Sequence, residues 1–219
     1  MSELGNSILL VVPARKGSSF TRKNLQPLNG KPLILYTLDA TRIKKPHDTI
    51  VTTDDPYVEE VVFPYGVKMD QRPDNLADDY ATLDNVMHYI AVTYPYSTYV
   101  CLPPTSPLRS AQHVEEALAL FESYNCDSMI GVTEERKAIW KLDDDAKLKP
   151  LVERTVNRQL AIPSYISNGA IFISKREAIL RSRKKASGVT MPYIMQPHHS
   201  VDIHTAEDLH LAEYLLGRS

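Results

Sequence analysis

The feature that most constrains the fold is the alternation of short apolar runs with helix-like patterns along the chain. Residues Ile8–Val12 are all apolar, which is typical of a parallel strand buried on both faces. Similar runs follow at residues 49–53, 67–69, 99–102 and 128–132, and helical spacing separates most of them. Strands and helices that alternate in this way predict β-α-β units, and therefore an α/β fold with a mostly parallel central sheet.

Capping residues mark several of the expected helices. Ser110 is the predicted N-cap of a helix over residues 111–123, and Pro56 is placed to open a short helix after the second strand. Thr205 and Asp208 form a predicted capping box at the start of the last helix, which continues as an apolar stripe. These signals fix the helix boundaries better than composition does.

The alternation stops between residues 134 and 167. Within this stretch, residues 141–146 have the pattern of a hairpin, and a polar segment follows it. A length of 219 residues fits one domain with a small appendage. We therefore interpret residues 1–219 as a single domain, and 134–167 as an insertion that projects from the sheet towards another subunit.

Bulk properties exclude several classes of partner. A formal net charge of −2 argues against duplex nucleic acid as a ligand. No apolar stretch approaches the roughly 20 residues that span a bilayer, and the first seven residues lack the pattern of a signal peptide. Cys101 and Cys126 form no C-x-x-C pair, so we expect buried thiols in a reducing compartment. These points favour a cytoplasmic protein with neither a nucleic-acid nor a membrane partner.

The chemistry is concentrated in the loop after the first strand. It reads Pro-Ala-Arg-Lys-Gly-Ser-Ser over residues 13–19, and four cations fall within nine residues: Arg15, Lys16, Arg22 and Lys23. Glycine and serine let backbone N–H groups approach a polyanion, and the cations neutralise phosphate charge. Ligands bind at the carboxyl ends of parallel strands. The loop therefore predicts a nucleoside triphosphate site, with a solvated basic turn as the alternative; it matches neither the Walker nor the dinucleotide fingerprint.

Six motifs, in order, resemble those of the acylneuraminate cytidylyltransferases, the CMP-sialic acid synthetases. They span residues 13–33, 50–54, 72–82, 104–109, 168–173 and 201–209. The resemblance implies a Rossmann-like, three-layer nucleotidyltransferase fold. It also implies transfer of CMP from CTP to the anomeric hydroxyl of a nonulosonic acid sugar with loss of pyrophosphate. The implied cofactor is Mg²⁺, with Mn²⁺ as the alternative, and the implied assembly is a homodimer.

The resemblance also implies a role for each matched residue. The triphosphate and nucleotide would be held by Arg15, Ser18, Lys23 and Asn24, in a pocket shaped by Arg72, Asp79 and Thr82. The acid sugar would be held by Thr105, Ser106, Asn168 and Gly169, and by Lys141 and Arg158 reaching it from the insertion in the partner subunit. The implied metal ligand is Asp202, and the implied catalytic residues are Arg15, Lys23, Asp202 and His204.

Most of these roles have a plainer alternative. Asp79 and Thr82 would then merely begin a helix, and Asn168-Gly169 would be a turn before a strand. Residues 104–107 would form a rigid loop without ligand contacts, and Lys141 would be a solvated charge on a hairpin. The sequence alone leaves these alternatives open.

Two departures from the family pattern leave the ligand contacts open. The first loop is one residue shorter than usual and carries Ser19-Phe20 where a lysine is common, so a phosphate contact is lost or moved to Lys16 or Arg22. Pro103 replaces a glutamine expected near the sugar. The leading hypothesis is a synthetase for sialic, legionaminic or pseudaminic acid. The alternatives are a same-fold enzyme with another acceptor or base, and a nucleotide-binding homologue without catalysis.

A third departure places His204 where a second aspartate usually follows Asp202. Imidazole is a poor ligand for Mg²⁺, but Asp202 with waters and triphosphate oxygens still suffices to bind this ion. One alternative is that His204 takes the proton from the attacking hydroxyl. Another is that His204 is an ordinary surface residue, and a third is that it joins His198, His199 and Asp202 in a transition-metal site.

Overall fold

The central element of this computed structural model is a seven-stranded sheet in the order β11-β7-β10-β6-β1-β4-β5. Each neighbouring pair is parallel, apart from the two pairs formed by β10, so the predicted mostly parallel sheet is confirmed. The structure describes residues 7–16, 22–78, 80–152 and 157–217, without the side chain of Arg158. The strands are β1 (Ile8–Pro13), β4 (Asp48–Thr53), β5 (Lys68–Gln71), β6 (Thr98–Cys101), β7 (Ser128–Glu135), β10 (Ser164–Lys175) and β11 (Thr190–Ile194).

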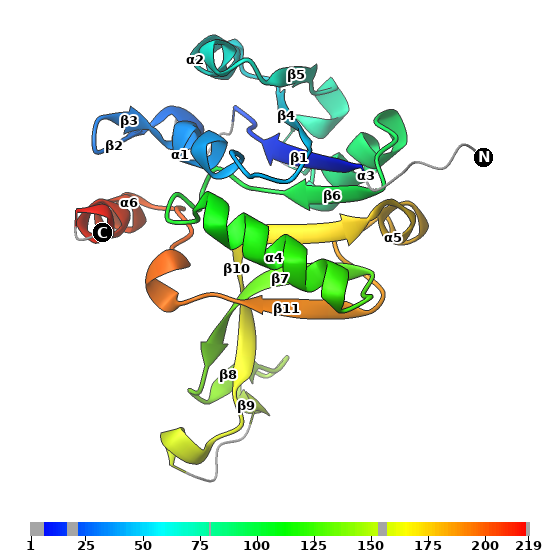
Figure 1. Cartoon of the computed structure of the whole chain (residues 1–219). Coiled ribbons are helices and arrows are strands. Elements are labelled where there is room, and N and C mark those ends of the chain that lie inside the picture. The colour runs from blue at the N-terminus through cyan, green and yellow to red at the C-terminus, as the bar shows by residue number, and fades with distance from the viewer. Residues whose placement is uncertain (1–6, 17–21, 79, 153–156, 218–219) are drawn as a thin grey trace.

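Helices cover both faces of this sheet and produce the three predicted layers (Figure 1). Leu10 of β1 packs in the core beneath α4, whereas its neighbours Leu9 and Val11 pack in the core beneath α3 and α5. This alternation follows from the pleat of a strand, and it explains why β1 is apolar at every position. The helices are α1 (Leu33–Ala40), α2 (Pro56–Val62), α3 (Leu83–Thr93), α4 (Ala111–Ser123), α5 (Arg176–Ser182) and α6 (Ala206–Leu216). Among the described residues, no helix has the length and apolar character needed to cross a membrane.

The predicted caps of two helices are confirmed. Ser110 caps α4 and accepts a hydrogen bond from the backbone N–H of His113. Thr205 and Asp208 form the capping box of α6, which packs on the short hairpin β2 (Pro27–Leu28) and β3 (Lys31–Pro32). Single-turn 3₁₀ helices lie at Lys23–Leu25 (η1), Phe63–Tyr65 (η2), Asp74–Leu76 (η3), Arg158–Leu160 (η4) and Pro197–His199 (η5).

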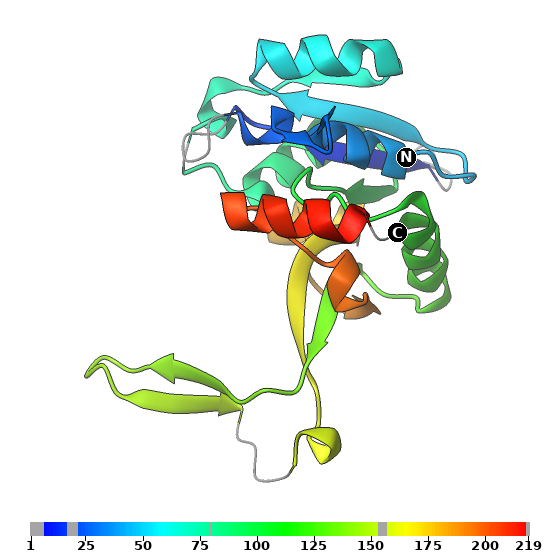
Figure 2. The same ribbon diagram turned by 90° about the vertical axis from the view of Figure 1, so that its left-hand side faces the viewer.

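Residues 136–152 and 157–163 belong to an arm that leaves the sheet as continuations of β7 and β10 (Figure 1 and Figure 2). Its hairpin consists of β8 (Ile139–Leu142) and β9 (Leu148–Val152), so the predicted hairpin is present. The predicted boundaries at residues 134 and 167 fall inside strands, because Ser164 pairs with Glu135 and Ser167 with Val132. The two boundary residues therefore lie in the β-ladder that leads into the arm, and the extent of the insertion stays a prediction. That the chain forms a single domain stays a prediction.

Two elements escaped the sequence analysis. The edge strand β11 includes Pro192 and pairs only with β7, an arrangement that tolerates a residue without a backbone N–H. Helix α5 is seven residues long, too short to establish a clear helical period. Both lie between residues 176 and 194, a stretch for which the sequence analysis predicted no element.

Candidate active site

A pocket of about 220 Å³ lies at the carboxyl ends of β1 and β6. Four of its lining residues are cations, and none of the described residues that line it is acidic. A concave site with this charge suits a polyanion. The lining residues are Pro13, Arg15, Lys16, Lys23, Asn24, Arg72, Ala81, Leu83, Val86, Pro103, Pro104 and Thr105. The pocket thus brings together five of the residues assigned by resemblance: Arg15, Lys23, Asn24, Arg72 and Thr105.

The backbone of the first loop is held in place by its neighbours. The Thr53 hydroxyl donates to the carbonyl oxygen of Ala14 (2.5 Å), and the backbone N–H of Lys16 donates to Asp54 Oδ1 (2.9 Å). Asn24 Nδ2 donates to the carbonyl oxygen of Arg15 (2.8 Å) and is largely buried. These hydrogen bonds fix the backbone positions from which the side chains of Arg15 and Lys16 extend. The sequence analysis missed Asp54, although a polar residue directly after a parallel strand is a common position for a site residue.

Arg15 also connects the two rims of the pocket. Its Nη1 donates to the carbonyl oxygen of Asp78 (2.9 Å), in the segment that precedes α3. The loop after β1 is thereby joined to a segment that lies 63 residues further along the chain. The two predicted nucleotide contacts Ser18 and Asp79 lie outside the described residues, so their roles stay predictions.

Arg72 is a buried positive charge in the wall of the pocket. Arg72 is 4% exposed, and its Nη2 donates to the carbonyl oxygen of Thr52 (3.0 Å). Burial lowers the pKa of Arg72, and the carboxylates of Asp54 and Asp70 oppose that shift. Its Nε atom is buried and has no hydrogen-bond partner among the described residues. A buried guanidinium with an unused donor is well suited to bind an anionic ligand.

The pKa of Lys23 is shifted by burial and by nearby charged residues. Burial lowers this pKa most, Asp202 raises it, and Arg15 lowers it again. Lys23 is therefore close enough to interact electrostatically with both residues. The backbone N–H of Ile203 donates to the carbonyl oxygen of Thr105, a residue that lines the pocket, so Asp202 lies beside the pocket on the segment that precedes α6.

The Asp202 carboxylate is closely surrounded. Its Oδ2 lies 2.9 Å from His204 Nε2, and its Oδ1 is buried without a hydrogen-bond partner among the described residues. Gly169 packs against it with φ of +72°, and a Cβ atom at this position would lie 2.7 Å from Asp202 Oδ2. Both the positive φ and the close contact therefore require glycine. The Thr105 carbonyl accepts from the N–H of Ile203 (2.8 Å) and fixes the neighbouring backbone.

The surroundings of Asp202 suit a magnesium ion held by one carboxylate rather than a transition metal held by several side chains. Its unpaired Oδ1 is a hard oxygen donor, and Mg²⁺ is commonly held by one or two carboxylates, waters and substrate phosphates. Among the described residues, no group of three or more His, Cys, Asp or Glu side chains is arranged to bind a metal. The transition-metal alternative is therefore wrong for these residues. The His199 ring instead lies between the rings of His198 and His113, tilted to both, at centroid distances of 4.1 and 4.6 Å.

Thr82 is placed by the structure at the start of a helix, as its plainer alternative predicted. Its hydroxyl accepts from the N–H of Asn85 (3.2 Å) and caps α3, and the side chain is exposed. Its neighbours Ala81 and Leu83 line the pocket, whereas Thr82 itself does not. Thr82 thus shapes the pocket through the helix that it caps.

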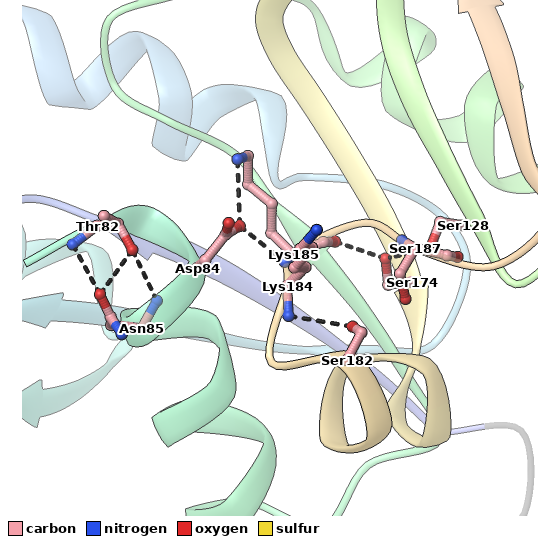
Figure 3. A network of polar contacts seen from close by, with 9 residues as sticks. All are labelled: Thr82, Asp84, Asn85, Ser128, Ser174, Ser182, Lys184, Lys185 and Ser187. Atoms are coloured by element: carbon pink, nitrogen blue, oxygen red, sulfur yellow. Dashed lines mark hydrogen bonds and ion pairs between the residues drawn. The ribbon is translucent and has the colours of Figure 1, made fainter.

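The same turn of α3 is anchored to the sheet by a polar network (Figure 3). Asp84 Oδ1 accepts from both the backbone N–H and Nζ of Lys185, at 2.9 and 3.2 Å. The Lys185 carbonyl accepts from the Ser174 hydroxyl (2.6 Å), whose oxygen also lies 3.0 Å from Ser128 Oγ. Ser174 and Ser128 belong to β10 and β7, so this wall of the pocket is tied to two central strands.

The residues assigned to the acid sugar are not gathered in one place. Ser106 is fully buried and does not line the pocket. Asn168 is also buried, with Nδ2 donating to Ser200 Oγ (2.9 Å) and Oδ1 accepting from the N–H of Ala170 (3.1 Å), so its amide is engaged within the fold. Lys141 is exposed on β8 in the arm and does not line the pocket of its own chain. Arg158 has its backbone in η4 of the arm, and its side chain lies outside the described part.

Comparisons with known proteins agree with this geometry. A family model described as cytidylyltransferase matches residues 9–214. The N-acylneuraminate cytidylyltransferase of Escherichia coli O18:K1:H7 is 34% identical over 216 residues, which cover 94% of this chain and 51% of that relative. The CMP-N,N'-diacetyllegionaminic acid synthase of Legionella pneumophila is 28% identical and covers 95% of this chain and 96% of its own length.

A solved structure of CMP:2-keto-3-deoxy-manno-octonic acid synthetase complexed with CTP has a TM-score of 0.73 to this chain. It covers 97% of this chain and 99% of the other, at 17% identity, and this likeness establishes the fold. The predicted α/β nucleotidyltransferase fold is therefore confirmed. The chain spans about half the length of the N-acylneuraminate cytidylyltransferases that it matches, at 53% and 51% of two of them.

Proposed function

This chain belongs to the cytidylyltransferase family, and we propose that it transfers CMP from CTP to the anomeric hydroxyl of a nonulosonic acid, releasing pyrophosphate. The observation that carries the proposal is the cationic pocket, where Arg15, Lys16, Lys23 and Arg72 converge at the carboxyl ends of parallel strands. Such an arrangement offsets the charge of a triphosphate before and during phosphoryl transfer. The names of the relatives support a nonulosonic acid as the acceptor.

Lys16 supplies the phosphate contact that the shortened first loop lacks. It lines the pocket, and its backbone N–H is fixed on Asp54. Arg22, the other candidate replacement, instead places its guanidinium 3.7 Å above the ring of Tyr57 on α2. A cation engaged with an aromatic face is less available to a ligand, so Lys16 is the better replacement.

Asp202 would hold Mg²⁺ through its unpaired Oδ1, with the remaining ligands coming from water and the triphosphate. When bound, this ion neutralises charge on the reacting phosphates. Lys23, which lines the same pocket, would share that task. Mn²⁺ is the alternative ion, because it accepts the same oxygen ligands.

His204 would accept the proton of the attacking hydroxyl. The hydroxyl oxygen forms a bond to the α-phosphorus of CTP, the bond from that phosphorus to the bridging oxygen breaks, and pyrophosphate leaves with the electron pair. His204 Nε2 lies 2.9 Å from Asp202 Oδ2, and its side chain is 65% exposed, so it is both oriented and accessible. An imidazole oriented by a carboxylate is suited to general-base catalysis.

The acceptor half of the site would be completed by a second copy of the chain. Lys141 and Arg158 lie in the arm, which points away from the central sheet of its own chain (Figure 2). The arm also exposes large apolar side chains: Trp140, Leu142, Leu148, Leu151, Leu160 and Ile162. Exposed apolar surface of this kind marks an interface. A homodimer in which each arm reaches the partner's pocket explains both observations.

A cytoplasmic location is part of the same proposal. Both cysteines are free and buried, which fits a reducing compartment. It also fits an enzyme whose nucleotide substrate is CTP, and expression of a tagged chain followed by fractionation tests it.

A pyrophosphate-release assay tests the proposed reaction. CTP, GTP, UTP and ATP are each combined with sialic, legionaminic or pseudaminic acid, in Mg²⁺ or Mn²⁺. We expect turnover with CTP and at least one of these sugars. Turnover only with a sugar phosphate or another base would support a same-fold enzyme of different specificity. CTP binding without turnover in any combination would support a homologue that has lost catalysis.

A further inference from the structure

Arg109 is a buried charge that connects three segments around the active site. It is 2% exposed. Its Nη1 donates to the carbonyl oxygens of Pro103 (3.1 Å) and Ala170 (2.7 Å), and its Nη2 donates to Thr37 Oγ1 (2.6 Å). The guanidinium thereby joins the loop after β6, strand β10 and helix α1. Only a planar fork with several donors reaches three acceptors in this way.

Two of these segments also hold Asp202. Thr105, in the loop after β6, accepts a hydrogen bond from the N–H of Ile203, the residue after Asp202 (2.8 Å). Gly169, in β10, packs so closely on the Asp202 carboxylate that no side chain fits between them. Asp202 is therefore fixed from two sides by segments that meet at Arg109.

The charge of Arg109 has no counterion among the described residues. Its three acceptors are neutral, its Nε is buried without a partner, and no carboxylate raises its pKa. Burial lowers the pKa of Arg109, and the Cys101 thiol is the group that opposes this shift. A buried ion is often replaced by apolar residues without loss of stability. Packing alone therefore does not account for an arginine at this position.

We propose that Arg109 is a positioning residue for CMP transfer, which sets the place of Asp202 relative to the loop that lines the nucleotide pocket. Its catalytic consequence rests on the proposed function, whereas its effect on the Asp202 segment does not. Arg109 does not line the pocket itself. It therefore acts through Asp202, and the cations that bind the triphosphate stay where they are when Arg109 is changed.

The variant Arg109→Lys keeps the charge and removes the fork. We expect the Kd for CTP without metal, measured by calorimetry, to stay within about threefold of the original value. We expect kcat to fall about 10²-fold, as misplacement of a catalytic group by about 1 Å does, and the Mg²⁺ concentration for half-maximal activity to rise. When Asp202→Asn is already present, adding Arg109→Lys should lower kcat little further, because both substitutions act through the Asp202 carboxylate. Fully additive losses would overturn the proposal.

The matched control is Arg176→Lys. Arg176 also donates to a backbone carbonyl, that of Ala91 at 3.0 Å, but it lies at the start of α5 and does not line the pocket. We expect this variant to leave the Mg²⁺ dependence of turnover unchanged. An equal shift in both variants would mean that any lost arginine bond has this effect, and would overturn the assignment to Arg109.

Hydrogen exchange gives a readout that needs no turnover. In Arg109→Lys, and in the milder Thr37→Val, which removes one acceptor, the Ile203 amide should exchange faster while the amides of β1 and β4 keep their protection. Thr37→Ser restores the hydroxyl and should restore slow exchange. Unchanged exchange at Ile203 would overturn the positioning role. If the original chain turns over no sugar, the proposed function fails while this experiment still decides the role of Arg109.

Discussion

The nucleotide pocket and the arm are built in opposite ways. Around the pocket, polar groups are held by specific bonds: Asn24 supports Arg15, Asp54 supports Lys16, and Arg109 supports the segments on both sides of Asp202. The arm is a two-stranded hairpin with large apolar side chains facing solvent and few tertiary partners. A two-stranded ribbon gains little stability by itself. The comparison favours our proposal that one chain forms the nucleotide half of the site and that a partner completes the acceptor half.

The largest effect is expected at the pocket. Arg15→Ala removes a cation from the triphosphate site and breaks the bond between the two rims, so turnover should fall about 10³-fold, as for loss of a key charge-stabilising donor. Steady-state pyrophosphate release measures this. Lys16→Ala, which leaves the rims joined, should have a smaller effect. Full activity of Arg15→Ala would remove this loop from the nucleotide site.

A substitution in the arm should weaken binding of the sugar and leave binding of the nucleotide unchanged. Arg158→Ala removes a guanidinium that pairs with the sugar carboxylate under our proposal, so the KM for the sugar should rise about 10-fold to 10²-fold, the range of a charged hydrogen bond. The KM for CTP should not change. The control is Arg181→Ala, an exposed arginine on α5. A rise in the KM for CTP with an unchanged KM for the sugar would contradict the assignment of Arg158 to the sugar.

The role of His204 in the reaction is either that of a general base or that of a residue standing where a second metal ligand is needed. If its imidazole accepts the proton, His204→Asp should lower kcat by about 10²-fold at saturating Mg²⁺, the usual contribution of a general base. A chain that needs a second carboxylate for the metal would behave oppositely and gain Mg²⁺-dependent activity. Comparison of kcat at several Mg²⁺ concentrations separates these outcomes. His210→Asp, exposed on α6, is the matched control.

The smallest effect is expected at the histidine row beside β11. The pKa of His113 is lowered by burial and by His199, and its Nδ1 accepts from the N–H of Ser110 at 3.1 Å, which requires a neutral ring. Its folded pKa is below the unfolded 6.5. Its contribution to stability is therefore complete above pH 6.5 and is lost as the pH falls through the folded pKa.

We expect the Tm to fall by about 2–4 °C between pH 7.5 and pH 5 on account of this cap, since loss of a helix cap costs on the order of 1 kcal/mol. His113→Gln keeps an acceptor that does not titrate and should reduce the fall. His210→Gln should leave it unchanged. A fall of the same size in all three proteins would show that other groups control the pH dependence.

The two regions also differ in how far the sequence predicted them. The continuous apolar run of β1 and the caps Ser110 and Thr205 are local signals, and they were correct. Five predicted pocket residues were brought together because parallel strands end at the same edge of the sheet. The extension of β7 and β10 into the arm was missed, because their pairing depends on a partner strand far away in sequence rather than on local propensity.

Within the site, the residues that the sequence analysis missed act through bonds rather than through contact with a ligand. Arg109 and Asp54 hold backbone segments, and nothing in their local sequence shows which carbonyl or N–H they meet. Thr82 was expected to shape the pocket and does so as a helix cap. Only the fold reveals the partners of Arg109 and Asp54, because Ala170 and Lys16 lie tens of residues away along the chain.

A mixing experiment tests most directly whether each site takes its nucleotide half from one chain and its acceptor half from another. Arg15→Ala and Arg158→Ala chains, each nearly inactive at a limiting sugar concentration, are unfolded together and refolded at equal amounts. Random pairing gives one intact site in each mixed dimer, so pyrophosphate release with CTP should recover to about a quarter of the original rate for a symmetric dimer. No recovery, with mixed dimers shown by mass spectrometry, would contradict the shared site.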